Sequence, residues 1–395
     1  MKKHVVILGT GFAGLELAAR LSESLFGAVR VTLIDRNDSF HFGFSKLDVL
    51  LGRQAPADVL LDYRNIATEG VEYRQENVRA IDLVRRRVIT DQRGYDADFL
   101  AIALGADYDM AATPGFRENG FEFYTLDTAE RLREALAEFE GGTILIAVLG
   151  HPFKCPPAPF EGAFLIHSLL AQRGVRDAVD MRMTFPMAAP VPVTAEVSQV
   201  FRLALEERGI HYLPKQLVVG LDARNRSARL RSGGAVQYDL FIGVPVHRVP
   251  AVVERSGLTD EGWVPVDQTN LSTRFPCVYA LGDVVKGPRT VAKAGIFAES
   301  AARVVAADIA SHLGYGEPPP PYAGDGPCYV EFGGGLVVKI EVNFLGGPAA
   351  TARIVMPSRE LAAEKRAFGA TRRRTWFDLG AGAVPVGISA DREGA

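Results

Sequence analysis

Cysteine is scarce in this chain, with three cysteines among 395 residues. Three thiols cannot form the disulfide framework of a small secreted protein, and an odd number leaves at least one of them unpaired. Any disulfide is therefore expected to be catalytic rather than structural. The cysteines and the seven histidines also lack the spacing of metal ligands, so no metal site is predicted.

An excess of one charge is lacking too, because 44 Lys and Arg residues face 47 Asp and Glu residues, which gives a net charge of −3. Nucleic acid is therefore not an expected partner, whereas small molecules are. No apolar run of about 18 residues suggests a helix that crosses a membrane. The N-terminus passes from MKKH into the expected strand VVILG without a secretory signal, so we expect a cytoplasmic location.

The most informative feature that is present is the glycine-rich sequence GTGFAG at residues 9–14. It stands between an expected strand at residues 4–8 and an expected helix at residues 15–24, and a second strand is expected at residues 29–35. This order is the start of a parallel βαβ unit. The complete pattern predicts a dinucleotide-binding site rather than a glycine turn without a ligand.

Each glycine of the loop is needed at its position for a different physical reason. Gly9 permits the tight turn, Gly11 lets the backbone approach a pyrophosphate, and Gly14 lets the helix pack against the strand. Asp35 ends the second strand, where it can bind a ribose hydroxyl. The candidate cofactor-binding residues of this unit are Gly9, Gly11, Phe12, Ala13, Gly14, Asp35 and Arg36.

Two later strands are expected to flank the same cofactor, at residues 99–105 (FLAIALG) and 278–283 (VYALGD), with a helix at residues 295–313. Asp283 can accept a hydrogen bond from the ribityl chain of a flavin. Lys293 either places positive charge against a reduced flavin or is a solvated surface lysine. The candidate cofactor-binding residues of these segments are Gly105, Gly282, Asp283, Lys293, Ala294 and Gly295.

These positions predict an α/β fold with two Rossmann-like domains of the FAD/NAD(P)-binding type and a smaller C-terminal domain. The first domain is discontinuous and comprises residues 1–112 and 270–316. Residues 113–269 form the second Rossmann-like domain. Residues 317–395 form the C-terminal domain, which begins at the proline run EPPPPY.

The second Rossmann-like domain lacks a nicotinamide fingerprint. Its first expected strand, at residues 143–149, is followed by the turn LGHPFKCPPAPFE, in which only Gly150 of the glycine pattern survives. The prolines of this turn remove the amide donors that hold phosphate. We therefore predict that this domain does not bind a nicotinamide dinucleotide.

Cys155 lies in that turn, beside Lys154 and before a helix expected at residues 160–172. The helix dipole and the lysine ammonium are expected to stabilise its thiolate and lower its pKa. Glu161 is either a proton shuttle for thiol chemistry or an acidic residue that stabilises the first turn of the helix. Cys277 alternates with apolar residues and is assigned to packing.

The C-terminal part combines Cys328, in the stretch GDGPCYVEFGGG, with a basic segment. The sequence alone does not show whether Cys328 approaches Cys155. Residues 353–378 carry seven basic and three acidic residues with apolar residues among them. This segment either docks on an anionic membrane surface or forms a solvated, partly amphipathic helix.

Together these motifs resemble the family of sulfide:quinone oxidoreductases and flavocytochrome c sulfide dehydrogenase flavoproteins. The matching pieces, in order, are GTGFAG, FKCPPAPFE, VYALGDV, AKAGIFAE and CYVEFGGG, and they span nearly the whole chain. The resemblance implies an FAD-dependent oxidoreductase that oxidises sulfide or a related sulfur compound. It further implies that Cys155 and Cys328 form a redox disulfide beside the flavin, that Glu161 is catalytic, and that a quinone or a cytochrome accepts the electrons.

The chain also departs from the family pattern. Phe44 and Ser45 stand where dehydrogenase members carry a cysteine for covalent flavin attachment, so noncovalent FAD is expected. The third cysteine of many quinone reductases has no counterpart at residues 123–127 (FYTLD), which argues against long polysulfide products. A homodimer and contact with the cytoplasmic face of a membrane are left open.

Two alternatives remain. An NAD(P)H-dependent flavoprotein reductase needs the second glycine fingerprint that this chain lacks. A noncatalytic FAD-binding redox sensor predicts that Cys155 and Cys328 lie far apart. The positions of the two sulfurs in the fold therefore help to distinguish a catalytic cysteine pair from a noncatalytic redox sensor.

Overall fold

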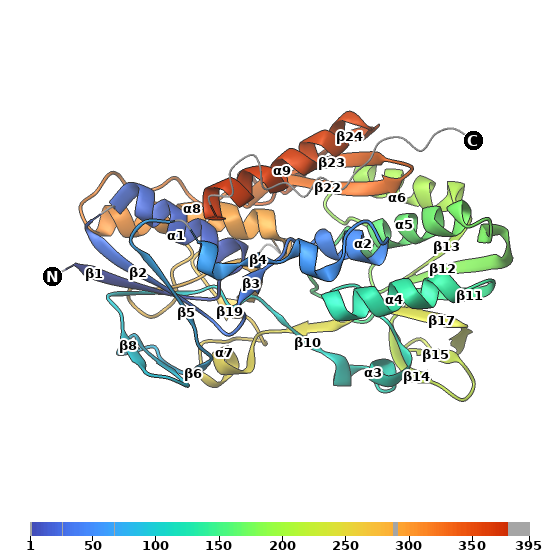
Figure 1. The fold of residues 1–395 in the computed structure, drawn as a ribbon, viewed down its shortest axis with the longest axis horizontal. Helices are drawn as coiled ribbons and strands as arrows, with labels where there is room; N and C mark the ends of the chain where they lie inside the picture. The colour runs from blue at the N-terminus through green and yellow to red at the C-terminus, as the bar shows by residue number, and fades with distance from the viewer. Residues whose placement is uncertain (1, 26, 67, 287–290, 378–395) are drawn as a thin grey trace.

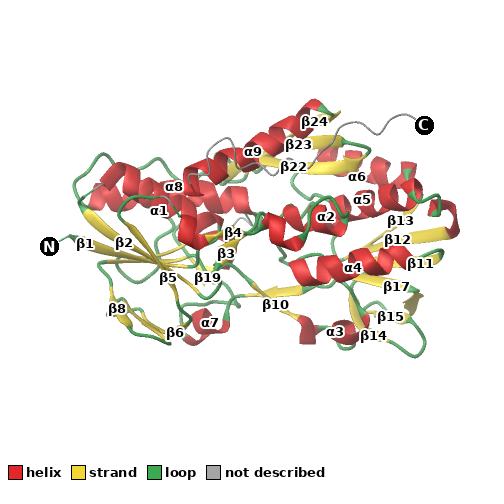
Figure 2. Ribbon diagram, viewed as in Figure 1, coloured by secondary structure: helices red, strands yellow, loops and turns green. Residues whose placement is uncertain are grey.

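The computed structural model describes residues 2–377 except residues 26, 67 and 287–290. Figure 1 and Figure 2 show two sheets at opposite ends of an elongated molecule, with helices packed along one side of each. The C-terminal strands and helix lie across that side, over both halves. The expected α/β class with Rossmann-like sheets is confirmed. The predicted domain boundaries remain a prediction.

The first sheet is parallel, with strand order β20-β9-β1-β2-β5. Its strands alternate between two cores, because Val5 and Ile7 pack under the helices α1 and α8, whereas Val6 and Leu8 pack toward the antiparallel strands β6 to β8. A sheet covered on both faces needs continuous apolar runs, which explains VVIL and FLAI. The bounds of these elements are β1 Lys3–Leu8, α1 Phe12–Leu25, β2 Val29–Asp35, β5 Val71–Gln75, β6 Val78–Asp82, β7 Arg87–Thr90, β8 Gly94–Asp96, β9 Phe99–Ile102, β20 Val278–Ala280 and α8 Gly295–His312.

The glycine loop between β1 and α1 is fixed by close backbone contacts. A Cβ atom on Gly9, whose φ is +99°, would collide with the carbonyl of Ala103, and one on Gly14 would collide with the carbonyl of Gly9. Gly11 differs, because a Cβ atom there would meet nothing within 4 Å. Two of the glycines are thus required by packing, and the third leaves open space beside the loop.

The second sheet is also parallel, with strand order β13-β12-β11-β17. Helices α4, α5 and α6 contribute to the largest apolar core of the described residues, which they share with all four strands of this sheet. A small antiparallel sheet of β14, β15 and β16 packs against the opposite face. The bounds are α4 Leu126–Glu138, β11 Gly142–Val148, α5 Ala158–Gln172, β12 Val179–Phe185, α6 Ala195–Glu207, β13 Ile210–Pro214, β14 Val218–Asp222, β15 Ser227–Leu230, β16 Ala235–Gln237 and β17 Leu240–Val244.

Short elements connect the two halves. The antiparallel pair of β10 and β18 runs from one half to the other in Figure 1. The remaining bounds are β3 Ser39–Phe40, α2 Ser45–Leu50, β4 Leu61–Asp62, β10 Asp107–Asp109, α3 Phe116–Asn119, β18 Val246–Arg248, α7 Ala251–Arg255, β19 Val264–Pro265 and β21 Val285–Lys286, with 3₁₀ turns at Pro56–Val59, Tyr63–Asn65, Met110–Ala112, Arg176–Ala178 and Gly282–Val284.

The C-terminal part is an antiparallel sheet of β22 Asp325–Gly333, β23 Leu336–Asn343 and β24 Thr351–Ser358, followed by α9 Glu360–Phe377. Trp376 is fully buried against the rings of Phe12 and Phe40, at 5.7 Å from each, and its Nε1 donates to Glu16 Oε2 at 3.0 Å. Phe377 is buried beside it. The end of α9 is therefore anchored to the dinucleotide-binding half.

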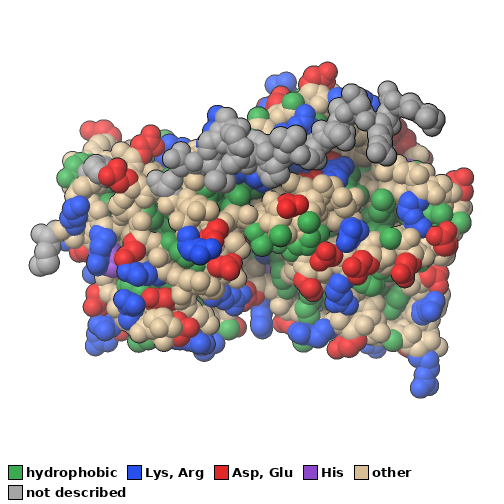
Figure 3. All heavy atoms as spheres, viewed as in Figure 1, with side chains coloured by type: hydrophobic (Ala, Val, Ile, Leu, Met, Phe, Trp, Pro, Cys, Tyr) green, Lys and Arg blue, Asp and Glu red, His purple; other side chains and the backbone are tan. Residues whose placement is uncertain are grey.

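This packing favours the amphipathic helix over the membrane-docking alternative for residues 353–377. Leu361, Trp376 and Phe377 point into the protein, so they do not offer apolar anchors to a bilayer. Position 378 lies outside the described residues. Among the described helices, none combines the length and the apolar character needed to cross a membrane. On the face drawn in Figure 3, basic and acidic side chains are interspersed, as the near-balanced composition predicts.

Replacing Trp376 with alanine is expected to destabilise the protein by about 3 kcal/mol, because it removes a fully buried indole and its hydrogen bond to Glu16. Trp376→Phe retains most of the packing and is expected to cost less. Urea denaturation measures the free energy of unfolding for both variants. The control is Leu203→Ala, which removes a side chain that is 46% exposed. This change is expected to alter the free energy of unfolding by less than about 0.5 kcal/mol. If the alanine variant were as stable as the native protein, Trp376 would not be an anchor that stabilises the end of α9.

Candidate functional site

A cavity of about 460 Å³ brings together most of the candidate residues from distant parts of the sequence. Its volume lies in the range of sites that bind small molecules and cofactors. The candidate residues that line it are Gly9, Gly11, Phe12, Ala13, Asp35, Gly105, Cys155, Glu161, Gly282, Asp283, Lys293, Ala294, Gly295 and Cys328.

Two candidates lie elsewhere. Gly14 is packed against the loop backbone, which is the role expected for it. The Arg36 side chain is 64% exposed and lies 3.5 Å from Asp107, so the structure does not bring it into the cavity wall. Cys277 is absent from the wall as well and packs against the core of the first sheet, as expected.

The nucleotide end of the cavity is formed by the glycine loop and Asp35. The Oδ2 atom of Asp35 accepts a hydrogen bond from the Thr10 amide at 2.7 Å, and Oδ1 accepts two from Asn37 at 2.9 Å. Because each carboxylate oxygen can accept more than one hydrogen bond, Asp35 retains capacity for a ribose hydroxyl. The open space beside Gly11 lies on the same wall.

Asp283 supplies the strongest sign that a polar ligand belongs in this cavity. Its Oδ1 atom is buried and has no hydrogen-bond partner. Burial raises the pKa of this carboxyl group, although Lys154, Lys293 and Lys46 act to lower it. A buried acceptor without a partner is costly, so this atom calls for a donor such as a hydroxyl group. A flavin dinucleotide supplies such hydroxyls, and the residues present fit it.

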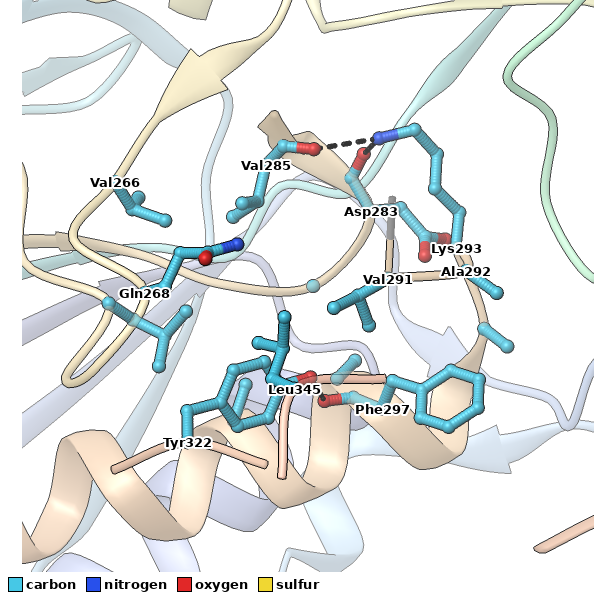
Figure 4. Close-up of a pocket in the computed structure, with 15 residues that line it drawn as sticks. Val266, Gln268, Asp283, Val285, Val291, Ala292, Lys293, Phe297, Tyr322 and Leu345 are labelled. Carbon is cyan, nitrogen blue, oxygen red and sulfur yellow. Dashed lines mark hydrogen bonds between the residues drawn. The ribbon is translucent and has the colours of Figure 1, made fainter. Parts of the chain in front are cut away.

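Lys293 is a buried residue rather than a solvated surface lysine. Figure 4 shows its ammonium directed at the backbone of Asp283 and Val285, whose carbonyl oxygens accept hydrogen bonds at 2.7 and 2.9 Å. The ammonium also lies 3.5 Å from the ring centroid of Trp263. Burial lowers the pKa of Lys293 to about 8. This lysine therefore holds the loop of Asp283 in place and carries a charge that titrates near neutral pH.

Cys155 and Cys328 line the same cavity as free thiols. Their charges interact, since a thiolate on Cys328 acts to raise the pKa of Cys155. The Cys155 amide donates to the Lys293 carbonyl at 2.6 Å, which ties the cysteine turn to the loop before α8. The fold therefore places both sulfurs on the wall that also carries the dinucleotide loop.

The expectation of a lowered Cys155 pKa was wrong. Burial raises the pKa of Cys155 well above its usual value, and the Glu161 carboxylate raises it further. The Lys154 ammonium points away from the sulfur, because Nζ donates to the Ala106 carbonyl at 3.0 Å and lies 4.3 Å from the centroid of the Tyr108 ring. Burial likewise raises the pKa of Cys328 to about 12, with Glu161 as the second cause. The pKa of the Cys155 thiol is therefore set by burial and not by the residues next to it in the sequence.

Glu161 lies in the first turn of α5 and is 4% exposed. Its Oε1 atom accepts hydrogen bonds from Lys365 Nζ at 3.0 Å and from the Glu331 amide at 2.9 Å. Burial raises the pKa of Glu161, and Lys365 partly offsets this rise. Glu161 lines the same cavity as Cys155 and Cys328, and its charge acts to raise the pKa of both thiols.

Several residues of the cavity wall were not predicted from the sequence. Lys365 lies in a segment that was interpreted only as basic. It is four residues from both Leu361 and Gly369, so it lies on the buried face of α9, and this spacing is the sequence signal that could have identified it. His41 and Lys46 also line the cavity; burial lowers their pKa values to about 4 and about 8. No local pattern marks these two. Phe44, Phe123 and Tyr124, from segments that the family resemblance already placed at functional cysteine positions, also line the cavity, and Phe368 is a further wall residue that was not predicted.

Replacing Asp283 with alanine is expected to weaken FAD binding about tenfold, because the cofactor loses a buried acceptor. The ratio of flavin to protein absorbance after desalting, and an FAD titration of the apoprotein, measure the loss. Asp91→Ala, at an exposed turn outside the cavity, is the matched control and is expected to retain full cofactor content. Equal FAD affinity in both variants would show that Asp283 does not contact the cofactor.

This chain is similar to known flavoprotein oxidoreductases in sequence. Residues 3–151 match the family model described as pyridine nucleotide-disulphide oxidoreductase. Mouse mitochondrial sulfide:quinone oxidoreductase is 24% identical over 319 residues, which cover 76% of this chain and 70% of the mouse protein. A type II NADH:quinone oxidoreductase of Staphylococcus epidermidis is 28% identical over 228 residues, which cover 53% of this chain and just 56% of that protein.

Solved structures share the fold. The sulfide:quinone oxidoreductase of Aquifex aeolicus superposes with a TM-score of 0.83 at 20% identity, covering 96% of this chain and 93% of that chain. NDH2 of Plasmodium falciparum, solved in complex with NADH, gives a TM-score of 0.73 at 13% identity and covers 94% of each chain. At these identities the superpositions establish the fold alone.

Proposed function

We propose that this FAD-dependent oxidoreductase, whose residues 3–151 match the pyridine nucleotide-disulphide oxidoreductase model, oxidises sulfide or a related sulfur compound and passes the electrons to a quinone. One observation carries the proposal: Cys155 and Cys328, 173 positions apart in the sequence, line one cavity with the dinucleotide loop. The sequence similarity to the mouse sulfide:quinone oxidoreductase supports the same reaction.

In the proposed reaction, hydrosulfide attacks a disulfide formed by Cys155 and Cys328. The substrate sulfur bonds to one cysteine, the disulfide bond breaks, and the other cysteine leaves as a thiolate. The substrate sulfur is thereby oxidised to a persulfide and the disulfide is reduced. A second hydrosulfide then takes the outer sulfur of the persulfide, leaves as hydrodisulfide, and returns that cysteine to a thiol. When bound, FAD would supply the two-electron chemistry that oxidises the two thiols back to the disulfide and reduces the acceptor.

The protein side chains have distinct tasks in this proposal. Asp283 and the glycine loop hold the cofactor. Lys293 keeps the Asp283 loop in place and adds positive charge. Glu161 takes up protons from the sulfur chemistry. The absence of a cysteine at Phe44 or Ser45 supports noncovalent FAD, which acid precipitation of the protein should release into the supernatant.

The test is anaerobic absorbance of the FAD-loaded protein during addition of sulfide and then of a short-chain quinone. Sulfide should bleach the flavin and the quinone should restore its colour. Cys155→Ser and Cys328→Ser are each expected to slow bleaching at least about a hundredfold, since either change removes the disulfide. Cys277→Ser, which alters the cysteine outside the cavity, is the matched control and should bleach at the native rate.

The similarity to type II NADH:quinone oxidoreductases makes NADH the competing electron donor. A parallel anaerobic titration with NADH separates the two functions. The sequence of the second Rossmann-like domain supports sulfide, because the turn after β11 carries prolines at positions that would need amide donors for phosphate. Bleaching by NADH but not by sulfide would overturn the proposed function.

A quinone acceptor also requires access to a lipid phase. We therefore include contact with a membrane surface in the proposal, made by side chains other than Leu361, Trp376 and Phe377, which are buried. Pelleting of the FAD-loaded protein with liposomes, compared with protein alone, tests this part separately from the sulfur chemistry.

A further inference from the structure

A buried group of charges lies beside the two cysteines. Nζ of Lys365, on α9, is 3.0 Å from Glu161 Oε1 and 2.8 Å from Glu331 Oε1. The side chains of Lys365 and Glu161 are 10% and 5% exposed, so water solvates neither charge well. Glu331, on β22, also lies 2.8 Å from Arg53, which is 42% exposed. The group thus extends from the cavity to the protein surface.

The two carboxylate oxygens of Glu161 differ in their surroundings. Both hydrogen bonds that Glu161 receives from the described residues end on Oε1. Oε2 accepts none of the hydrogen bonds found within the described part of the chain, and the residue lines the cavity. One oxygen is therefore fixed, and the other is free to accept a proton from the cavity side.

We propose that Lys365 is a positioning residue: its ammonium fixes Oε1 of Glu161 and keeps Glu161 ionised, so that Oε2 can take a proton from the sulfur chemistry at Cys155 and Cys328. A buried carboxylate without a cation would be neutral, because burial disfavours the charged form. The Glu331 carboxylate shares the ammonium but has a second cation in Arg53. Lys365 is thus the cation that Glu161 depends on.

The role rests on the proposed function, in which a persulfide forms in the cavity. The persulfide S–H bond breaks, its proton moves to Oε2 of Glu161, and the persulfide sulfur keeps the electron pair as an anion. No electron leaves the sulfur in this step, so no further oxidant is required. The protonated Glu161 remains hydrogen-bonded to Lys365 and later returns its proton to solvent.

Several charged or titratable groups face Glu161 or Lys365 from the surrounding elements. Lys365 from α9 and Glu331 from β22 act on the pKa of Glu161. The charge of Glu161 in turn acts on the pKa values of Cys155 before α5, Cys328 on β22 and Tyr124 before α4. Asp48 of α2 faces Lys365. The Lys365 ammonium is the cation nearest to Glu161 among them.

The test uses thiol reactivity to report the charge of Glu161, independently of sulfide. The FAD-loaded protein is reduced with a phosphine, and alkylation of Cys155 and Cys328 by iodoacetamide is followed at pH 8 by peptide mass spectrometry. Glu161→Gln is expected to speed alkylation roughly tenfold if each thiol pKa falls by one unit, because the carboxylate raises both values. Cys277 is the internal reference and should react at an unchanged rate.

The same Glu161→Gln change is then made in a Lys365→Met background. If Lys365 keeps Glu161 ionised, Glu161 is already neutral in this background, and the glutamine change should alter alkylation less than about twofold. Lys365→Arg, which keeps the cation, should restore the large effect. An equally large effect of Glu161→Gln with and without Lys365 would overturn the proposal. If the Met variant does not fold, Lys365→Gln supplies the background without the cation, and the same loss of the Glu161→Gln effect is expected there.

The pH dependence of bleaching by sulfide gives a second readout. Lys365 acts to lower the pKa of Glu161, so its removal raises that pKa further. The acid limb of the rate profile, where Glu161 must be ionised to accept a proton, should therefore move to higher pH in Lys365→Met and stay in place in Lys365→Arg. Failure of sulfide to bleach any variant, with the alkylation results as expected, would refute the proposed function and leave the role of Lys365 intact.

Discussion

The site depends on one electrostatic constraint, the need of a buried carboxylate for a buried cation. Glu161 comes from the middle of the chain and Lys365 from its last described helix, 204 positions later. Neither group is stable alone in an apolar interior, because the cost of removing a charge from water is repaid only by a close partner. Their pairing therefore joins the C-terminal helix to the wall that carries the two sulfurs.

The same helix is anchored a second time, at its other end. Trp376 packs on Phe12 of the dinucleotide loop and bonds to Glu16 in the helix that follows it. One helix thus contacts the region around the cysteines through Lys365 and the region around the cofactor loop through Trp376. The C-terminal part, which the sequence marks mainly by its basic character, is a structural component of both ends of the cavity.

The parts that could be predicted from the sequence are those governed by local backbone geometry. The GTGFAG loop, the buried strands and Asp283 follow from short patterns in which neighbouring residues act on one another. The failed prediction concerned Cys155, where Lys154 was assumed to act on the sulfur beside it; the side chain instead turns to Ala106. Lys365 and Lys46 were missed for the same reason, because their surroundings come from segments distant in the sequence. Local patterns therefore identified most residues that line the cavity, but they did not determine the electrostatics around the thiols.

The position of Lys365 and Trp376 late in the sequence has a consequence for biosynthesis. Synthesis proceeds from the N-terminus, and domains generally fold in that order. The glycine loop and the first sheet's N-terminal strands leave the ribosome long before α9, so the nascent chain exposes its dinucleotide loop while the wall that completes the cavity does not yet exist. The cavity is therefore completed only after α9 has been synthesised and has packed against the earlier parts of the chain.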